Sequence, residues 1–409
     1  MRQSTGMSVL VTPGRLRSAL AVTRSLGRRG VEVTVADEDG RSLAGVSRYC
    51  RASVRVPSAA RSSEAFVNAI RQEVGRTKHS VVIPTDDVTL SLIAQARSQF
   101  EGLAVLPFPD FETVQTAHDK AALMTLAAEK GIPVPRTVVV RGPADVENAI
   151  RQVGLPAVVK ARVSRVPVGG QWRAGGAVHY VRTTAELDAA IRAVQELTPG
   201  PLVQEHISGD GRGIFVLMNR GRVRAAFAHR RLREKPPSGG VSVLSESIGL
   251  DPQLLDHAER ILEALKWHGV AMVEFKRDAR DGVTKLLEIN GRFWGSLQLA
   301  VDSGVDFPYL LYRLAIDGDI DPVFTYRVGV RLRWWLGDLD WLLLRLREGG
   351  LARRLGAIPE FLRPVGRATK AEIFRRDDPA PAIREISQYS HALLRGAAAR
   401  FGRSPGSGA

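Results

Sequence analysis

Short apolar runs alternate with longer amphipathic segments along the first quarter of the chain. The runs at 8–11, 31–37 and 80–85 are typical of buried strands, and the segments 15–29 and 62–76 between them are predicted to be helices. Regular strand–helix alternation favours an open parallel sheet with helices on its faces. We therefore expect an N-terminal α/β domain over 1–112.

The pattern changes after residue 113. A helix is expected at 116–130, ended by Gly131, and a strand at 156–162. Residues 163–181 follow, with four glycines around a tryptophan, and are predicted to form a mobile loop between two strands. A further strand is expected at 201–207.

Two hairpins and a helical end complete the pattern. Residues 214–229 alternate like a hairpin, and strand-like runs at 270–278 and 283–290 flank the turn ARDG. Residues 230–243 are rich in charge, proline and glycine, so we expect a loop there. The region 326–409 is predicted to be a separate, mainly helical segment with a disordered tail.

The second of these hairpins carries the strongest candidate chemistry. In an antiparallel hairpin centred on the ARDG turn, Glu274 and Glu288 face each other to within about one residue of register. Side chains alternate along a strand, so Asn290 and Arg292 share the face of Glu288. Opposed carboxylates repel by up to about 1 kcal/mol, and a dication would reverse that sign.

The donor types define the candidate ligand. Two carboxylates and an amide suit Mg²⁺ or Mn²⁺ and not Zn²⁺, and Mg²⁺ usually completes its shell with substrate phosphates. Arg292 could neutralise a phosphoryl group. After Gly295 a helix is expected with Ser296 as its cap, which is a favourable place for an anion. Charges scattered on an exposed sheet face are the alternative.

Two lysines could hold phosphates. Lys160 ends an apolar strand, and Lys120 lies at a predicted helix start, where a cation opposes the helix dipole. Each could equally be an edge or surface lysine. There is no Walker A sequence, because no lysine of the chain is followed by serine or threonine.

Composition limits the class of protein. The 409 residues, 44% hydrophobic and 25% charged, suit a soluble protein of two or three domains. We find no apolar run long enough for a transmembrane helix and no signal-peptide core, so no membrane partner is expected. The single cysteine excludes an intramolecular disulfide and favours a cytoplasmic location.

The net charge of +15 leaves a second class of function open. A basic surface could serve nucleic acid or an acidic ligand, although the arginines are scattered and fit a coding bias. The best nucleic-acid candidate, residues 330–348, is too dense in tryptophan and leucine for an exposed face and is expected to pack as a core helix. Nucleic-acid binding is therefore the weaker alternative.

Several motifs in order resemble the ATP-grasp superfamily, which includes biotin carboxylase, D-alanine–D-alanine ligase and the carbamoyl-phosphate synthetase large chain. The motifs are HDK at 118–120, VVK at 158–160, the glycine-rich segment, LVQEHISG at 202–209 and EINGRFWGS at 288–296. The resemblance covers 113–318. It implies an α/β chain with an ATP-grasp domain of α+β type over 113–325, including a lid subdomain at about 135–203.

The resemblance also implies residue roles. Lys120 and Lys160 would contact ATP phosphates, and Glu274, Glu288 and Asn290 would hold Mg²⁺. Arg292 would lie at the reacting phosphoryl group, with Lys160 also counted as catalytic. The adenine and ribose would be contacted by Gln204, Glu205, His206, Ile207 and Asp210. Candidate residues for the acceptor substrate are Arg231, Arg233, Trp294 and Ser296.

The chain departs from the superfamily's usual pattern at two positions. Gly291 and Ala161 stand where proline usually follows the metal asparagine and the strand lysine. Neither change removes a ligand. The implied activity is ATP-dependent carboxylate–amine ligation through an acyl phosphate, releasing ADP and phosphate, in a possible homo-oligomer. A phosphotransferase that stops at phosphorylation would use the same metal site.

Overall fold

The computed structural model describes residues 7–237, 239–347, 350–363 and 369–401. Its first unit is a parallel sheet with strand order β3-β2-β1-β4. The fully buried central strand β1 (Ser8–Thr12) pairs with β2 (Glu32–Asp37) and β4 (Val81–Pro84), and β2 pairs with β3 (Ala52–Arg55). The helices of this unit are α1 (Arg17–Gly27), α2 (Ser63–Thr77), α3 (Asp87–Gln95) and a short 3₁₀ helix (Arg97–Phe100).

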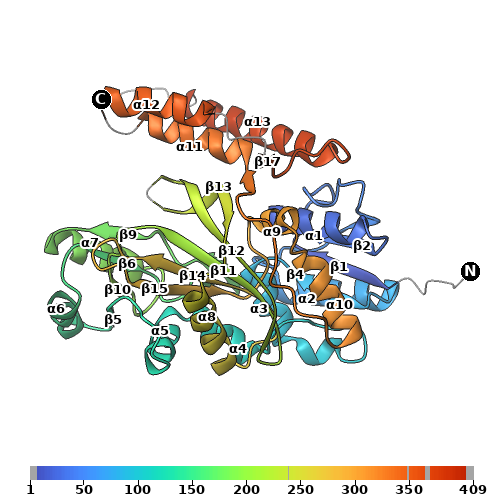
Figure 1. Ribbon diagram of the computed structural model, residues 1–409, viewed down its shortest axis with the longest axis horizontal. Coiled ribbons are helices and arrows are strands. Elements are labelled where there is room, and N and C mark those ends of the chain that lie inside the picture. Colours follow the sequence, from blue (N-terminus) through green and yellow to red (C-terminus); the bar gives the residue numbers. More distant parts are fainter. Residues whose placement is uncertain (1–6, 238, 348–349, 364–368, 402–409) are drawn as a thin grey trace, which may run out of the picture.

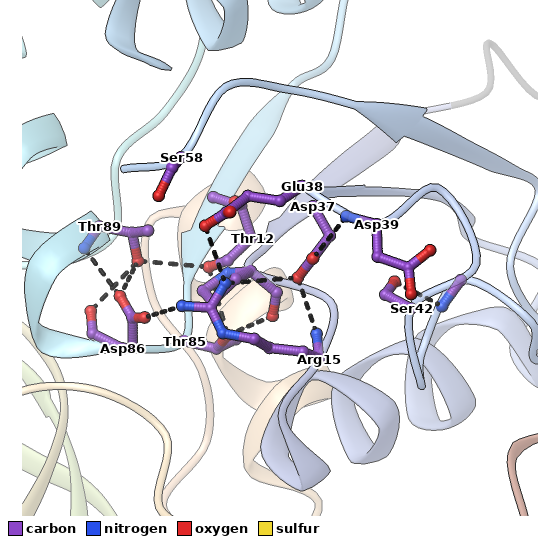
Figure 2. Close-up of polar contacts among 12 residues, drawn as sticks. Thr12, Arg15, Asp37, Glu38, Asp39, Ser42, Ser58, Thr85, Asp86 and Thr89 are labelled. Carbon is purple, nitrogen blue, oxygen red and sulfur yellow. Dashed lines mark hydrogen bonds and ion pairs between the residues drawn. The ribbon is translucent and has the colours of Figure 1, made fainter. Parts of the chain in front are cut away.

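A charged cluster fixes the loops at the carboxyl ends of these strands (Figure 2). The Arg15 guanidinium donates to Asp86 at 3.2 Å, and the Arg15 backbone N–H donates to the Asp37 carboxylate at 2.9 Å. Asp86 also caps α3 by accepting the backbone N–H of Thr89 at 2.8 Å. The cluster therefore holds the first turn of α3, which begins at Asp87.

The prediction of a single helix over 116–130 is wrong, because the structure divides this region into two helices. α4 (Phe111–His118) ends before Asp119, whose extended backbone and carboxylate cap α5 (Lys120–Glu129) through the N–H groups of Ala121 and Ala122. Asp119 also pairs with Arg162. Lys120 therefore sits in the first turn of a new helix.

The second unit is a small antiparallel sheet with order β5-β10-β6-β9. Its strands are β5 (Thr137–Val139), β6 (Ala157–Lys160), β9 (His179–Val181) and β10 (Leu202–Glu205), and its helices are α6 (Pro143–Gln152) and α7 (Thr184–Gln195). The segment predicted as a loop contains a hairpin instead, formed by β7 (Arg165–Val168) and β8 (Gln171–Ala174). Gly169 and Gly170 make its turn with positive φ angles of 56° and 75°.

The largest sheet lies between the other two units (Figure 1). Its order is β15-β14-β11-β12-β13-β16-β17. The strands are β11 (Gly211–Asn219), β12 (Arg222–Lys235), β13 (Val241–Ile248), β14 (Gly269–Arg277), β15 (Thr284–Asn290), β16 (Arg331–Arg333) and β17 (Thr369–Ala371), with α8 (Pro252–Ala264) packed on β11 and β12.

The predicted loop at 230–243 is largely strand, since β12 continues to Lys235 and β13 begins at Val241. The charged side chains of this stretch are compatible with a strand because each finds a partner. Arg230 pairs with Glu246, Arg231 with Glu274 and Arg233 with Asp338. Local polarity misled the sequence prediction here.

The end of the chain is helical, but it also contributes to the large sheet. β16 pairs with β13, and β17 pairs with β16. The helices are α9 (Leu297–Ser303), α10 (Phe307–Asp317), α11 (Trp335–Arg347), α12 (Leu351–Leu362) and α13 (Ala380–Phe401). In Figure 1 the last three form an orange-to-red layer along one side. The predicted disordered tail, 402–409, lies outside the described residues.

Over the part of the chain that the structure describes, no helix combines the length and the apolar character needed to cross a bilayer.

Candidate functional site

The two candidate metal-binding carboxylates face each other across β14 and β15. Glu274 is the register partner of Glu288, as the hairpin argument predicted. The Asn290 side-chain amide donates to Glu274 Oε1 at 3.2 Å and to Glu288 Oε1 at 3.1 Å. Three polar side chains therefore converge on one point of the sheet.

Cations of the protein offset the repulsion between these carboxylates. Arg231 Nη2 donates to Glu274 Oε2 at 2.6 Å, and Lys120 Nζ lies 3.8 Å from Glu288 Oε2. Burial raises the pKa of Glu274 more than Arg231 lowers it, and Glu288 raises it further. Burial acts in the same sense on Glu288, but Lys120 and Lys160 outweigh it, so the pKa of Glu288 is lowered. The pKa values of the two carboxyl groups are therefore shifted in opposite directions.

Lys160 lies close enough to the carboxylate pair for their charges to interact, and its role toward phosphate stays a prediction. It ends β6 of the small sheet, and burial together with the charge of Lys120 lowers its pKa to about 8, although Glu288 and Glu274 act to raise it. Lys120 donates to Ser164 Oγ at 2.8 Å. Both lysines thus lie near the carboxylate pair, on the side of the small sheet.

Arg292 joins the carboxylate pair to the N-terminal unit. Its Nη2 donates to Asn290 Oδ1 at 3.0 Å, and its Nε lies 3.2 Å from Asp87 Oδ1. His118 Nε2 is 3.6 Å from the same Asp87 oxygen. Sequence reasoning missed Asp87 and His118. The position of Asp87, just after the carboxyl end of a predicted parallel strand, was the available signal.

A cleft of about 940 Å³ runs between the small and large sheets past Glu274, Glu288, Asn290 and Arg292. Its lining includes Tyr180 and His206 at one end, and Arg231, Arg292 and Trp294 near the carboxylates. The lining also includes Arg17, which the sequence did not single out. Trp294 is buried, with its ring centroid 4.2 Å from that of Phe215, so it forms the apolar floor of this end of the cleft.

Arg17 is held in place by the C-terminal part of the chain. It pairs with Glu372, and its guanidinium lies 4.0 Å from the centroid of the Trp334 ring. A β-carbon at Gly295 would come within 3.0 Å of Arg17. Arg17, Arg231 and Arg292 therefore bring three cations from distant segments to one end of the cleft.

The predicted adenine-binding residues occupy different environments. Gln204 is buried and donates to Thr137 Oγ1 at 2.8 Å, while the buried Ile207 and the exposed Asp210 lie on the segment that leads into β11. Glu205 pairs with Arg280 and Lys285, which with Arg136 lower its pKa to about 2, although burial would raise it. The His206 ring lines the cleft, 5.5 Å from the Tyr180 ring. The roles of all five stay predictions.

One of the acceptor-site predictions, Arg233, needs correction. Arg233 is buried and donates to Asp338 Oδ2 at 2.6 Å and to the Glu360 carbonyl at 2.7 Å, so it serves the contact of β12 with the C-terminal helices. Ser296 lines the cleft and stands at the N-cap position of α9, as expected, although its side chain makes no capping hydrogen bond. Its role toward the acceptor substrate stays a prediction. The bulge in β12 between Arg231 and Arg233 explains why these two arginines diverge.

The first departure from the superfamily pattern has a steric cause. A β-carbon at Gly291 would lie 2.7 Å from the buried Trp267 ring. Only glycine leaves room for this tryptophan beside the strand end. The change therefore belongs to packing and leaves Glu288 and Asn290 in place.

The donor set fits a hard divalent cation. Among the residues described, no group of three or more histidine, cysteine, aspartate and glutamate side chains could hold a metal ion. Two half-buried carboxylates and one amide oxygen are instead what Mg²⁺ uses when substrate phosphates complete its shell. Glu274, Glu288 and Asn290 would hold it.

Lys160 on the small sheet and Lys120 at the start of α5 lie near paired carboxylates on the large sheet, which is the arrangement expected of a domain that encloses a metal–nucleotide complex. Residues 198–336 match the family model described as "ATP-grasp in the biosynthetic pathway with Ter operon". The chain therefore contains an ATP-grasp domain, and the resemblance noted in the sequence is confirmed.

Solved structures agree on the fold. Biotin carboxylase from Campylobacter jejuni superposes with a TM-score of 0.63 at 18% identity, covering 79% of this chain and 74% of that chain. L-amino acid ligase from Bacillus licheniformis gives a TM-score of 0.60 at 20% identity, covering 78% of each chain. The predicted α/β fold class with an ATP-grasp domain is confirmed.

Among curated relatives, D-aspartate ligase from Enterococcus faecium (strain Aus0004) is 23% identical over 227 residues. That match covers 53% of this chain and 54% of the ligase, so the chain spans about half the length of this relative.

Proposed function

We propose that the protein is an ATP-dependent carboxylate–amine ligase. The observation that carries the proposal is the placement of Glu274, Glu288 and Asn290 beside an arginine-lined end of the same cleft. The carboxylates and Asn290 suit a metal–nucleotide complex, and Arg17, Arg231 and Arg292 suit an anionic acceptor. D-aspartate ligase and L-amino acid ligase, both similar to this chain, carry names consistent with the proposal.

The residues of the chain would act mainly by position and charge. Lys120 and Lys160 would hold the phosphates of ATP, and the cleft end near His206 would receive adenine. Arg292 would bring the acceptor carboxylate in line with the terminal phosphoryl group and neutralise charge that builds there. Bound Mg²⁺ would supply further charge neutralisation on the phosphates.

The reaction proposed has two steps. A carboxylate oxygen of the acceptor attacks the terminal phosphorus of ATP, which gives an acyl phosphate and ADP. An amine then attacks the acyl carbon, the bond to the phosphate oxygen breaks, and an amide and phosphate remain. Closing the cleft against water would protect the acyl phosphate from hydrolysis.

Phosphate release tests the proposal. The protein is incubated with ATP and Mg²⁺ and screened against pools of amino acids and small carboxylic acids. We expect release only when a carboxylate and an amine are both present. A carboxylate that yields ADP and a stable phosphorylated product, with no response to any amine, would replace the ligase with a phosphotransferase.

The alternative function, nucleic-acid binding, gains no support from residues 330–348, the segment that made the best candidate for it. Trp341 of α11 is buried, with Arg233 and Arg345 over its ring, and Arg333 lies 3.8 Å from the centroid of the exposed Trp335 ring. These aromatic residues are engaged by arginines of their own chain.

A further inference from the structure

Arg17 is a cation of the main cleft to which the two reaction steps give no separate task. Those steps need one carboxylate beside the terminal phosphate of ATP, and Arg292, which donates to Asn290, is placed to meet it. Arg17 reaches the same cleft from α1 of the N-terminal unit. It lies outside residues 198–336, the segment that the family model matches, so that likeness assigns no role to it.

Arg17 and Arg292 are anchored by different parts of the molecule. Asp87, in the first turn of α3, lies 3.2 Å from Arg292 Nε. Arg17 is held instead by Glu372, just after β17, which accepts from Nη1, and by the ring of Trp334. The two guanidinium groups are therefore fixed independently of each other, and each can meet an anion of its own.

The guanidinium group of Arg17 has unused donors that face the cleft. Neither Nε nor Nη2 donates a hydrogen bond to any described residue, and neither is fully buried. The side chain is 11% exposed and lines the cleft. A β-carbon at Gly295 would lie 3.0 Å from Nη2, which places this nitrogen against the turn between β15 and α9. A ligand at this turn can therefore reach Arg17.

The charge of Arg17 is compensated only in part. Burial raises the pKa of Glu372 to about 7, although Arg17 acts to lower it, so close to neutral pH this carboxyl is protonated in some of the molecules. Arg231, in contrast, pairs with both Glu234 and Glu274. Glu372 is also only 4% exposed, so a ligand in the cleft meets the guanidinium group and not its buried partner.

We propose that the carboxylate substrate carries a second anionic group, such as another carboxylate, and that Arg17 binds this group. The inference rests on the ligase function proposed above and defines the class of its carboxylate substrate. Arg292 would meet the carboxylate that is phosphorylated, and the forked donors Nε and Nη2 of Arg17 would hold the second anion. Fixing one end of the substrate in this way would orient the other end toward ATP.

The preference of the enzyme among carboxylates is the first test. Each acid that supports amine-dependent phosphate release is compared with the analogue in which its second anionic group is a neutral amide, for example succinate with succinamate. We expect kcat/KM to be higher for the diacid by about tenfold or more. Acids with a single anionic group that react as well as any diacid would overturn the inference and leave the ligase function standing. If no carboxylate supports amine-dependent release, the ligase function itself fails.

Variants of Arg17 are the second test. Arg17→Met removes the charge from a long side chain, so it should lower kcat/KM for the diacid about tenfold more than for the monoamide. Arg17→Lys keeps a cation beside Glu372 but loses the fork, so it should show a smaller difference of the same sign, and it serves the comparison if the methionine variant does not fold. The exposed Arg71→Met, on α2, should lower neither value.

Glu372→Gln is the matched control for the structural role of the ion pair. It removes the charge of the partner, while glutamine can still accept a hydrogen bond from Arg17 Nη1. The preference for the diacid should survive this change. Equal losses for the two acids in Arg17→Met, or a preference lost as fully in Glu372→Gln as in Arg17→Met, would overturn the inference.

Discussion

The roles of single residues depend on how closely charges are placed. Glu274 and Glu288 are compatible with a folded sheet because Arg231, Lys120 and Asn290 contact them. A half-buried like-charge pair held in this way has little structural use, and it is the kind of arrangement found at functional sites.

Loss of one of these charges should abolish activity without unfolding the protein. Glu288→Gln keeps the shape of the side chain but removes a negative charge that would hold Mg²⁺. We expect Mg²⁺-dependent ATP turnover to fall by about 10²-fold or more, with an unchanged circular dichroism spectrum. The exposed Glu259→Gln is the control. Normal turnover in the Glu288 variant would refute the site.

Lys160 should supply affinity for ATP. Lys160→Ala should weaken ATP binding by about 1.5–3 kcal/mol, the range for a hydrogen bond to a charged group, as measured by calorimetry, whereas the exposed Lys130→Ala should not. The pKa of Lys160 is lowered to about 8, so its charge is present below that pH and lost above it. The difference between variant and wild type should therefore shrink as the pH rises through about 8. A difference that is absent or constant with pH would contradict this role.

At the scale of elements, alternate residues of β12 serve different neighbours. Arg231 points to the carboxylate pair, while Arg233 and Arg333 share the buried Asp338 of α11. Arg233→Ala would leave that carboxylate with one partner fewer, so we expect a loss of about 3–5 kcal/mol in stability, seen in urea denaturation, with an unchanged KM for the carboxylate substrate. Arg231→Ala should raise that KM. If Arg233→Ala instead raised the KM and Arg231→Ala did not, the prediction from the sequence that Arg233 contacts the acceptor substrate would stand.

The elements also show what the sequence could predict. The β14–β15 hairpin was predicted in register because its turn signal and alternation are local. The break at Asp119 was missed although the Asp119 carboxylate caps α5 locally, through the N–H groups of Ala121 and Ala122; only its contact with Arg162 is not local. The strand character of 230–235 was missed because its charges find non-local partners, on β13, β14 and α11.

The same difference between local and non-local contacts decides which site residues the sequence could predict. Residues within one hairpin, such as Glu274 and Asn290, could be placed from spacing alone. Arg17 and His118 reach the site from the N-terminal half and could not be placed from the sequence, because their approach depends on how the units pack. Asp87 had one sequence signal, its position just after a predicted parallel strand.

At the scale of the whole molecule, the end of the chain is pinned to its beginning. Arg24 of α1 donates to Asp378 at 2.8 Å, and both side chains are about 1% exposed. Ser47 Oγ also donates to Asp378 at 2.7 Å. This contact holds the segment that carries Glu372 against Arg17 and so connects the C-terminal region to the cleft.

Breaking this contact should destabilise the molecule. Asp378→Ala leaves Arg24 buried and unpaired, so we expect a loss of about 3–5 kcal/mol in the free energy of unfolding measured with urea. The neighbouring Asp377, 47% exposed and paired with Arg28, is the control, and its alanine variant should lose less than about 1 kcal/mol. Equal losses would mean that the buried pair does not anchor the C-terminal segment.

The central claim is that the cleft joins a carboxylate to an amine through an acyl phosphate, and oxygen transfer tests it most directly. The carboxylate substrate is labelled with ¹⁸O, and the phosphate released during amide formation is analysed by mass spectrometry. One labelled oxygen should appear in each phosphate, because the bridging oxygen of the acyl phosphate leaves with phosphorus. Unlabelled phosphate accompanying confirmed amide formation would contradict the account.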